Sequence, residues 1–188
     1  MKRLYIPILS LLLTASAFSA TAVSLKLSGD GAVDATTIQA GKKVSFDIYL
    51  ENDGNFKGVT LGFKVISNGI KTVVHPADSG NGLNEHGDVK AYNGWQDESV
   101  WDMLGGLYVA KTDWDGTLPD ILGFGGISKG KGYMPHKLEK KLSFDLIIDT
   151  PGEITIDSAF FAPSGRWKFA PPATTPKWGG PYTFKVVK

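Results

Sequence analysis

The residues best suited to binding or chemistry lie in a central segment, from Asn84 to Asp115, that holds three of the chain's five tryptophans. Flat aromatic rings stack on the apolar faces of sugars and also anchor protein partners. The alternative is that these tryptophans cover an open edge of the fold, a cover that Trp167 and Trp178 would join. The candidate ligand-binding residues are Tyr92, Trp95, Trp101 and Trp114, of which Tyr92 and Trp95 flank the turn-forming pair Asn93-Gly94.

Acidic residues near this segment offer oxygen ligands of the kind that calcium accepts. They are Asp113, Asp115 and Asp120, and their spacing does not reproduce an EF-hand loop. Asx turns, in which a carboxylate accepts a nearby backbone N–H, account for the same residues without a metal. We therefore expect no cofactor, with a structural calcium ion as the alternative.

Two patterns in the sequence resemble parts of catalytic sites. The stretch 126–130 matches Gly-x-Ser-x-Gly, but the sequence after it cannot form the helix of a nucleophile elbow, and His136 follows too closely. Acids such as Asp97, Glu98 and Asp102 lie near aromatic rings, yet nothing in their spacing pairs them for glycoside hydrolysis. We therefore expect a protein without catalytic activity, and a small glycoside hydrolase is the alternative.

The N-terminus has the pattern of an export signal. Lys2 and Arg3 precede the apolar run Leu4 to Leu13, and small residues follow. A run of about ten residues is too short to span a bilayer. The sequence predicts a signal peptide over 1–20, cleaved between positions 17 and 22, one domain over 23–188, and a secreted or cell-surface location with no membrane insertion after cleavage.

Composition excludes several classes of protein. Without Lys2 and Arg3 the 20 basic residues fall to 18, close to the 19 acidic ones, and no basic cluster indicates nucleic acid. Cysteine is absent, which excludes disulfides and thiol catalysis. The 23 glycines and 10 prolines favour a fold with frequent turns.

Apolar and polar residues alternate along several short stretches bounded by turn residues, which is typical of β-strands. The pattern predicts an all-β fold, an antiparallel sandwich of about nine strands of the jelly-roll or immunoglobulin-like kind. A long aromatic insertion and one short helix over 97–104 interrupt it. The expected strands are 23–27, 44–51, 59–66, 70–74, 107–109, 121–124, 142–146, 154–161 and 182–187.

Four segments together resemble the cohesin family. The stretch 40–52 places an Ala-Gly pair before a strand that ends in Glu51 and Asn52, and Gly58 leads into the next strand. Late in the chain, the strand 142–146 is followed by a strand that Gly152 leads. The resemblance covers roughly residues 23–75 and 138–188.

The resemblance implies a nine-stranded jelly-roll sandwich without catalytic activity, similar in fold to cellulose-binding modules. It also implies an extracellular recognition or surface-assembly module that binds a dockerin-type protein partner or a polysaccharide. The central segment is longer and richer in tryptophan than in cohesins, so no binding residue is carried over to it. The alternatives are a carbohydrate-binding module, the small glycoside hydrolase, and a structural surface or fibre subunit.

Overall fold

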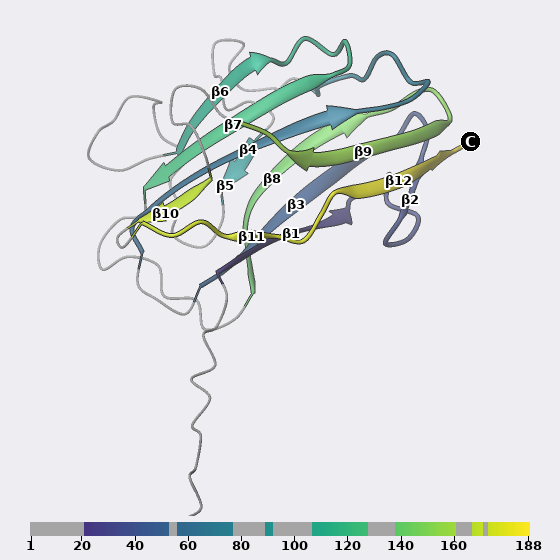
Figure 1. The fold of residues 1–188 in the computed structure, drawn as a ribbon. Coiled ribbons are helices and arrows are strands. Elements are labelled where there is room, and N and C mark those ends of the chain that lie inside the picture. The colour runs from purple at the N-terminus through teal and green to yellow at the C-terminus, as the bar shows by residue number, and fades with distance from the viewer. Residues whose placement is uncertain are drawn as a thin grey trace, which may run out of the picture.

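The computed structural model describes residues 21–188 except 53–55, 77–88, 92–106, 128–137, 161–166 and 171–172. All of its regular elements are β-strands, and the described residues contain no helix. The strands form two sheets that lie face to face as a sandwich (Figure 1). None of the described residues forms a helix that could cross a membrane. The predicted all-β sandwich is confirmed.

The smaller sheet has five strands, in the order β11–β1–β3–β8–β5. Their bounds are β1 (Ala22–Ser28), β3 (Lys43–Glu51), β5 (Val89–Ala91), β8 (Glu139–Ile147) and β11 (Lys177–Trp178).

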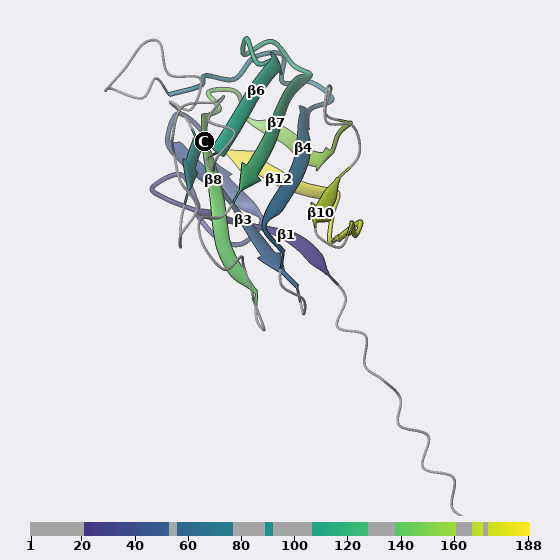
Figure 2. The same cartoon turned by 90° about the vertical axis from the view of Figure 1, so that its left-hand side faces the viewer.

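The larger sheet runs in the order β2–β12–β9–β4–β7–β6, and β10 also pairs with β4. Figure 2 shows β6, β7 and β4 side by side. The bounds are β2 (Thr37–Gln39), β4 (Gly58–Ile66), β6 (Leu107–Asp113), β7 (Asp120–Ile127), β9 (Gly152–Ser158), β10 (Lys168–Ala170) and β12 (Tyr182–Val187).

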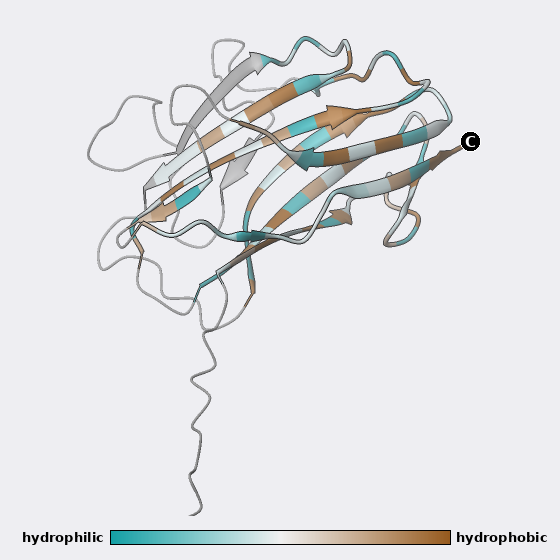
Figure 3. Cartoon of the chain, in the orientation of Figure 1, coloured by the Kyte–Doolittle hydropathy of each residue, from teal (hydrophilic) through white to brown (hydrophobic). Residues whose placement is uncertain are grey.

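Because apolar and polar residues alternate along the strands, one row of side chains from each strand lies between the sheets. Figure 3 shows the alternation as bands of hydropathy. Phenylalanine fills the centre of this core. Within the smaller sheet the Phe46 ring stacks on Phe144 at 5.2 Å between centroids, and within the larger sheet the edge of the Phe63 ring meets Phe124 at 5.5 Å. Between the sheets, the centroids of the Phe63 and Phe144 rings lie 6.2 Å apart. All four rings are fully buried. Because the chain has no cysteine, this packing holds the two sheets together.

The strands differ from the prediction in three respects. Strands β2, β5, β10 and β11 are two or three residues long, too short to show an alternating pattern, and were not predicted. Stretch 70–74 forms isolated bridges at Thr72 and Val74 rather than a strand. The pairs β1–β11 and β2–β12 are parallel, so both sheets are mixed rather than wholly antiparallel. The predicted helix and the signal peptide lie outside the described residues.

Strand β4 has two partners along the same edge. It pairs with β9 through residues 63–66 and with β10 through residues 58–60. Leu61 and Gly62 lie between the residues of β4 that pair with β9 and those that pair with β10. The ladder along this edge of β4 is therefore interrupted at these two residues. The carbonyl oxygen of Gly62 there accepts the N–H of Ala159, the residue after β9, at 2.8 Å.

Candidate functional site

Part of the predicted site lies within the described residues. Tyr92, Trp95 and Trp101 lie outside the described residues, as do the acids 97, 98 and 102 and the serine of the Gly-x-Ser-x-Gly match. Trp114 is therefore the one predicted ligand-binding residue whose surroundings the structure describes.

Trp114 follows the end of β6 and is half-buried. Its ring lies 4.0 Å from the imidazole of His75 between centroids, and it meets the core ring of Phe144 at 5.8 Å in an edge-to-face arrangement. Part of its surface is thus used for packing.

His75 and Asp120 form a closely bonded pair beneath Trp114. His75 Nε2 lies 2.7 Å from Asp120 Oδ2, and the Asp120 side chain is fully buried. The backbone N–H of Gly116 donates to the other Asp120 oxygen at 3.3 Å. Both carboxylate oxygens therefore have a hydrogen-bond donor, as a buried carboxylate requires.

The three acids predicted as weak calcium ligands do not converge. Asp113 and Asp115 are exposed, whereas Asp120 is buried against His75. Asp115 accepts the backbone N–H of Thr117 at 2.7 Å, the Asx turn expected as the alternative to a metal. Across the described part of the chain, no group of three His, Cys, Asp or Glu side chains is arranged to hold a metal ion.

Gly116 completes this turn with a backbone conformation that suits glycine. Its φ is +88°, and a Cβ built there would lie 2.6 Å from the carbonyl oxygen of Val73. The N–H of Val73 in turn donates to the carbonyl oxygen of Gly116 at 2.8 Å. The Asp-Gly pair therefore fixes the loop that carries Trp114 beside His75.

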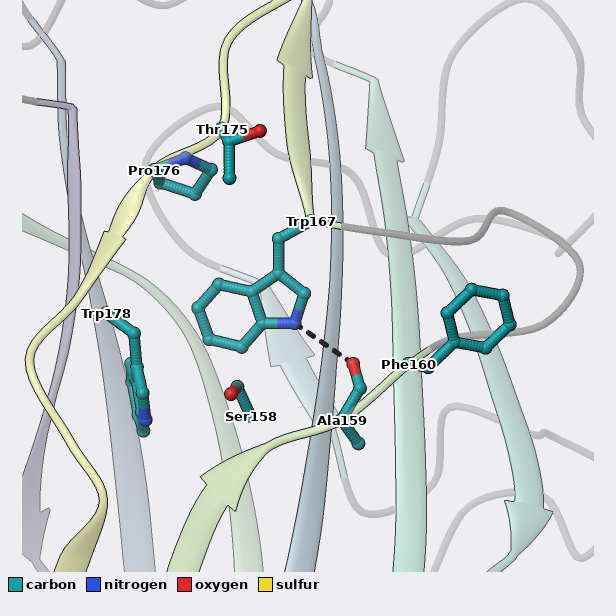
Figure 4. A pocket seen from close by; sticks show the side chains of 7 residues that line it. All are labelled: Ser158, Ala159, Phe160, Trp167, Thr175, Pro176 and Trp178. Atoms are coloured by element: carbon teal, nitrogen blue, oxygen red, sulfur yellow. Dashed lines mark hydrogen bonds between the residues drawn. The ribbon is translucent and has the colours of Figure 1, made fainter.

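A second group of aromatic residues surrounds a pocket of about 310 Å³ at the side of the sandwich. Figure 4 shows the ring of Trp167 at the centre of the pocket, with Trp178 and Phe160 on opposite sides of it. Phe160 is 68% exposed, and Trp178 is half-buried. The remaining lining residues are Ser158, Ala159, Thr175 and Pro176.

Trp167 fills the interruption in the β4 ladder. Its indole N–H donates to the carbonyl oxygen of Gly62 at 2.9 Å and is shared with that of Ala159 at 3.3 Å. The Ala159 N–H also donates to Gly62, at 2.8 Å. The indole N–H is therefore a second donor to the buried Gly62 carbonyl oxygen, beside the N–H of Ala159 that directly follows β9, and its ring forms part of the pocket lining.

Trp178 forms one wall of the pocket. Its ring meets Trp167 at 5.2 Å between centroids, with an angle of 71° between the planes. Its indole N–H donates to Asp157 Oδ1 at 3.1 Å, and Lys64 Nζ lies 3.5 Å from Asp157 Oδ2. Neither Trp167 nor Trp178 is among the predicted site residues. The signal for them is two tryptophans set among glycine, proline and lysine in loops near the C-terminus.

The outward face of the smaller sheet is crossed by charges that satisfy each other. Lys140 lies 3.2 Å from Asp47, and Lys43 lies 3.4 Å from Asp145. Asp145 also accepts the Ser45 hydroxyl at 2.6 Å. The Asp47 and Asp145 side chains are 5% and 6% exposed, so a partner on this face would have to separate ion pairs that are already largely shielded.

The outward face of the larger sheet has a different composition. Register pairs Gly62 of β4 with Gly123 of β7, and Thr60 with Gly125. Gly58 continues the same outward row of β4. Glycine inside a strand offers no side chain to pack, and it often marks a place where another backbone or a ligand approaches closely.

No protein-family model matches the sequence, and no curated protein is significantly similar to it. The structure is nevertheless similar to solved cohesin structures over most of its length. The sixth cohesin of scaffoldin B from Acetivibrio cellulolyticus, solved with a Cel5 dockerin, has a TM-score of 0.54 and 9% identity, and the match covers 89% of this chain and 98% of the cohesin chain. The fold is that of a cohesin module.

Two further structures agree with this cohesin-like fold. The cohesin module of a family 33 glycoside hydrolase from Clostridium perfringens has a TM-score of 0.52 at 9% identity, covering 89% of this chain and 96% of that chain. The OlpC cohesin from Clostridium thermocellum, solved in complex with a dockerin, has a TM-score of 0.50 at 11% identity and covers 89% and 92%. At these identities the similarity establishes the fold alone.

Proposed function

We propose that this cohesin-like chain is an exported, non-catalytic recognition module that binds a protein partner of the dockerin type. The observation that carries the proposal is the match to the Acetivibrio cellulolyticus cohesin over 98% of that chain, in a structure that contains its dockerin. The basic start and short apolar run at the N-terminus support export and a secreted or cell-surface location.

The outward face of the larger sheet is the surface that suits such a partner. Its β4 and β7 rows contain glycine and threonine, of which Gly58, Thr60 and Gly125 are half-buried and Gly62 and Gly123 are buried. Small residues allow a partner's backbone to approach closely. The smaller sheet is disfavoured because docking there would desolvate the Lys140–Asp47 and Lys43–Asp145 pairs. Contact between flat, low-relief surfaces depends on shape complementarity, so one large side chain in the centre would prevent it.

The test uses the chain from residue 21 onward and a panel of dockerin modules, with binding measured by biolayer interferometry. Thr60→Arg places a long side chain between Gly58 and Gly62 on the proposed face. Ser28→Arg is the matched control, because Ser28 is a half-buried polar residue on the outward row of β1 in the other sheet.

We expect at least one dockerin to bind, Thr60→Arg to weaken that binding by about tenfold or more, and Ser28→Arg to leave it unchanged. A panel with no binding dockerin would contradict the proposed partner. Equal affinities for the two arginine variants would instead contradict the assignment to the larger sheet.

A further inference from the structure

We propose that the pocket between Trp167, Trp178 and Phe160 is a second binding site, which takes one pyranose ring of a neutral glycan. The pocket's volume of about 310 Å³ exceeds that of one sugar ring and leaves it open to a longer chain. The ring planes of Trp167 and Trp178 make an angle of 71°, and Phe160 lies on the side of Trp167 opposite to Trp178. The pocket therefore has apolar surfaces in several directions. The chemistry of the lining then decides among the possible occupants.

A cationic occupant is disfavoured by the charges beside the pocket. An aromatic cage for an ammonium group uses ring faces, commonly with a carboxylate nearby. The carboxylate here is Asp157, and Lys64 Nζ already lies 3.5 Å from it while its other oxygen accepts the Trp178 indole. The local charge is therefore balanced, and Lys64 would repel a second cation.

A proline-rich peptide is disfavoured by the indole hydrogen bonds. Such peptides dock in aromatic grooves, and a peptide in that conformation has carbonyl groups that need donors. The Trp167 N–H is committed to Gly62 and Ala159, and the Trp178 N–H is committed to Asp157. Half-buried Trp178 thus offers aromatic surface to an occupant, Trp167 is 7% exposed and contributes only the part of its ring that lines the pocket, and both keep their donors for the fold.

A purely aliphatic side chain is disfavoured by the polar groups of the lining. Ser158 and Thr175 are the lining residues that carry hydroxyl groups, and within the described part of the chain the Ser158 hydroxyl has one long contact, of 3.5 Å with Asp157. Covering hydroxyl groups with hydrocarbon costs free energy unless they regain partners. The occupant should therefore combine an apolar face with hydroxyl groups.

A neutral pyranose has this combination. Its axial C–H bonds give the ring an apolar face that stacks on an aromatic side chain, and its hydroxyl groups donate and accept at the rim. Trp178 and Phe160 supply aromatic surface that remains exposed, with Trp167 as the floor. Ser158 and Thr175 carry the hydroxyl groups with which such a ring could form hydrogen bonds at the edge of the pocket.

The test is isothermal titration calorimetry of the chain from residue 21 onward with cellohexaose, xylohexaose and chitohexaose. Phe160→Ala removes the most exposed ring, and Thr175→Val removes a hydroxyl at nearly constant volume. Val33→Ala is the matched control, because Val33 is a 56% exposed hydrophobic residue away from the pocket. Melting temperatures verify that each variant remains folded.

We expect at least one oligosaccharide to bind with a Kd of about 1 mM or tighter. Phe160→Ala should weaken that binding by about tenfold, Thr175→Val should weaken it measurably, and Val33→Ala should not change it. The proposal is overturned if none of the three sugars binds saturably, or if Phe160→Ala and Thr175→Val both bind as the native chain does. Dockerin binding by Phe160→Ala should stay native, so the outcome here is separate from that of the docking proposal.

Discussion

The indole N–H of Trp167 donates to the carbonyl oxygen of Gly62 at 2.9 Å, between residues 105 positions apart in the sequence. This bond lies where the pairing of β4 changes from β9 to β10, so a side chain adds a second donor to a carbonyl oxygen that also accepts the Ala159 N–H. The same side chain forms the floor of the aromatic pocket. One residue therefore links the integrity of the larger sheet to the shape of the candidate glycan site.

Replacing Trp167 by Phe should destabilise the fold by about 2 kcal/mol, because the buried bonds to Gly62 and Ala159 are lost and the smaller ring leaves a space. Trp178→Phe is the matched control. Its N–H bonds Asp157, whose side chain is 26% exposed and also near Lys64, so the loss should be about 1 kcal/mol or less. Urea unfolding monitored by circular dichroism measures both. If both variants lost the same free energy of unfolding, the bonds from the Trp167 indole to the backbone would stabilise the fold no more than the Trp178–Asp157 bond does.

His75→Ala should lower the free energy of unfolding by about 2–4 kcal/mol, because it removes the partner at 2.7 Å from a fully buried Asp120 carboxylate. Lys64→Ala breaks the partly exposed pair with Asp157 and should cost less than about 1 kcal/mol. Urea unfolding at neutral pH compares the two. In a double-mutant cycle, Asp120→Asn should recover part of the loss caused by His75→Ala, and strict additivity would argue against the coupling.

Lys141 should make the free energy of unfolding depend on pH in the alkaline range. Burial lowers its pKa below the ordinary 10.5, although Glu139 at 3.7 Å acts in the opposite direction. Between the lowered folded pKa and 10.5, the unfolded chain binds more protons than the folded chain. The free energy of unfolding contributed by this group therefore rises with pH across that window.

Lys141→Met removes the titrating group, so the native chain should gain stability relative to this variant as the pH rises through the alkaline window that ends at the ordinary pKa of 10.5. Urea unfolding across that range gives the difference. Lys168→Met, at an exposed position, is the control and should run parallel to the native chain. Parallel curves for Lys141→Met as well would mean that Lys141 is ionised equally easily in both states.

The sequence by itself determined the class of fold. Alternation in stretches such as 44–51 and 59–66 predicted the strands β3 and β4, since a sheet with one buried face requires a two-residue period. The resemblance to cohesins rested on these same strands and was confirmed at the level of the fold. The tryptophans could be recognised as candidates for binding, because their ring size and shape are properties of the residue type.

Only the tertiary structure decided what the described tryptophans contact. Trp114 rests on His75, and Trp167 bonds Gly62, because β-sheet register brings together residues that are far apart in the chain. Strands of two or three residues, such as β10 and β11, show no period of their own and exist because a longer strand pairs with them. The break between β9 and β10 on β4, and the aromatic pocket beside it, follow from that pairing. The local sequence does not predict this pairing, since each backbone hydrogen bond in a ladder depends on a partner elsewhere in the chain.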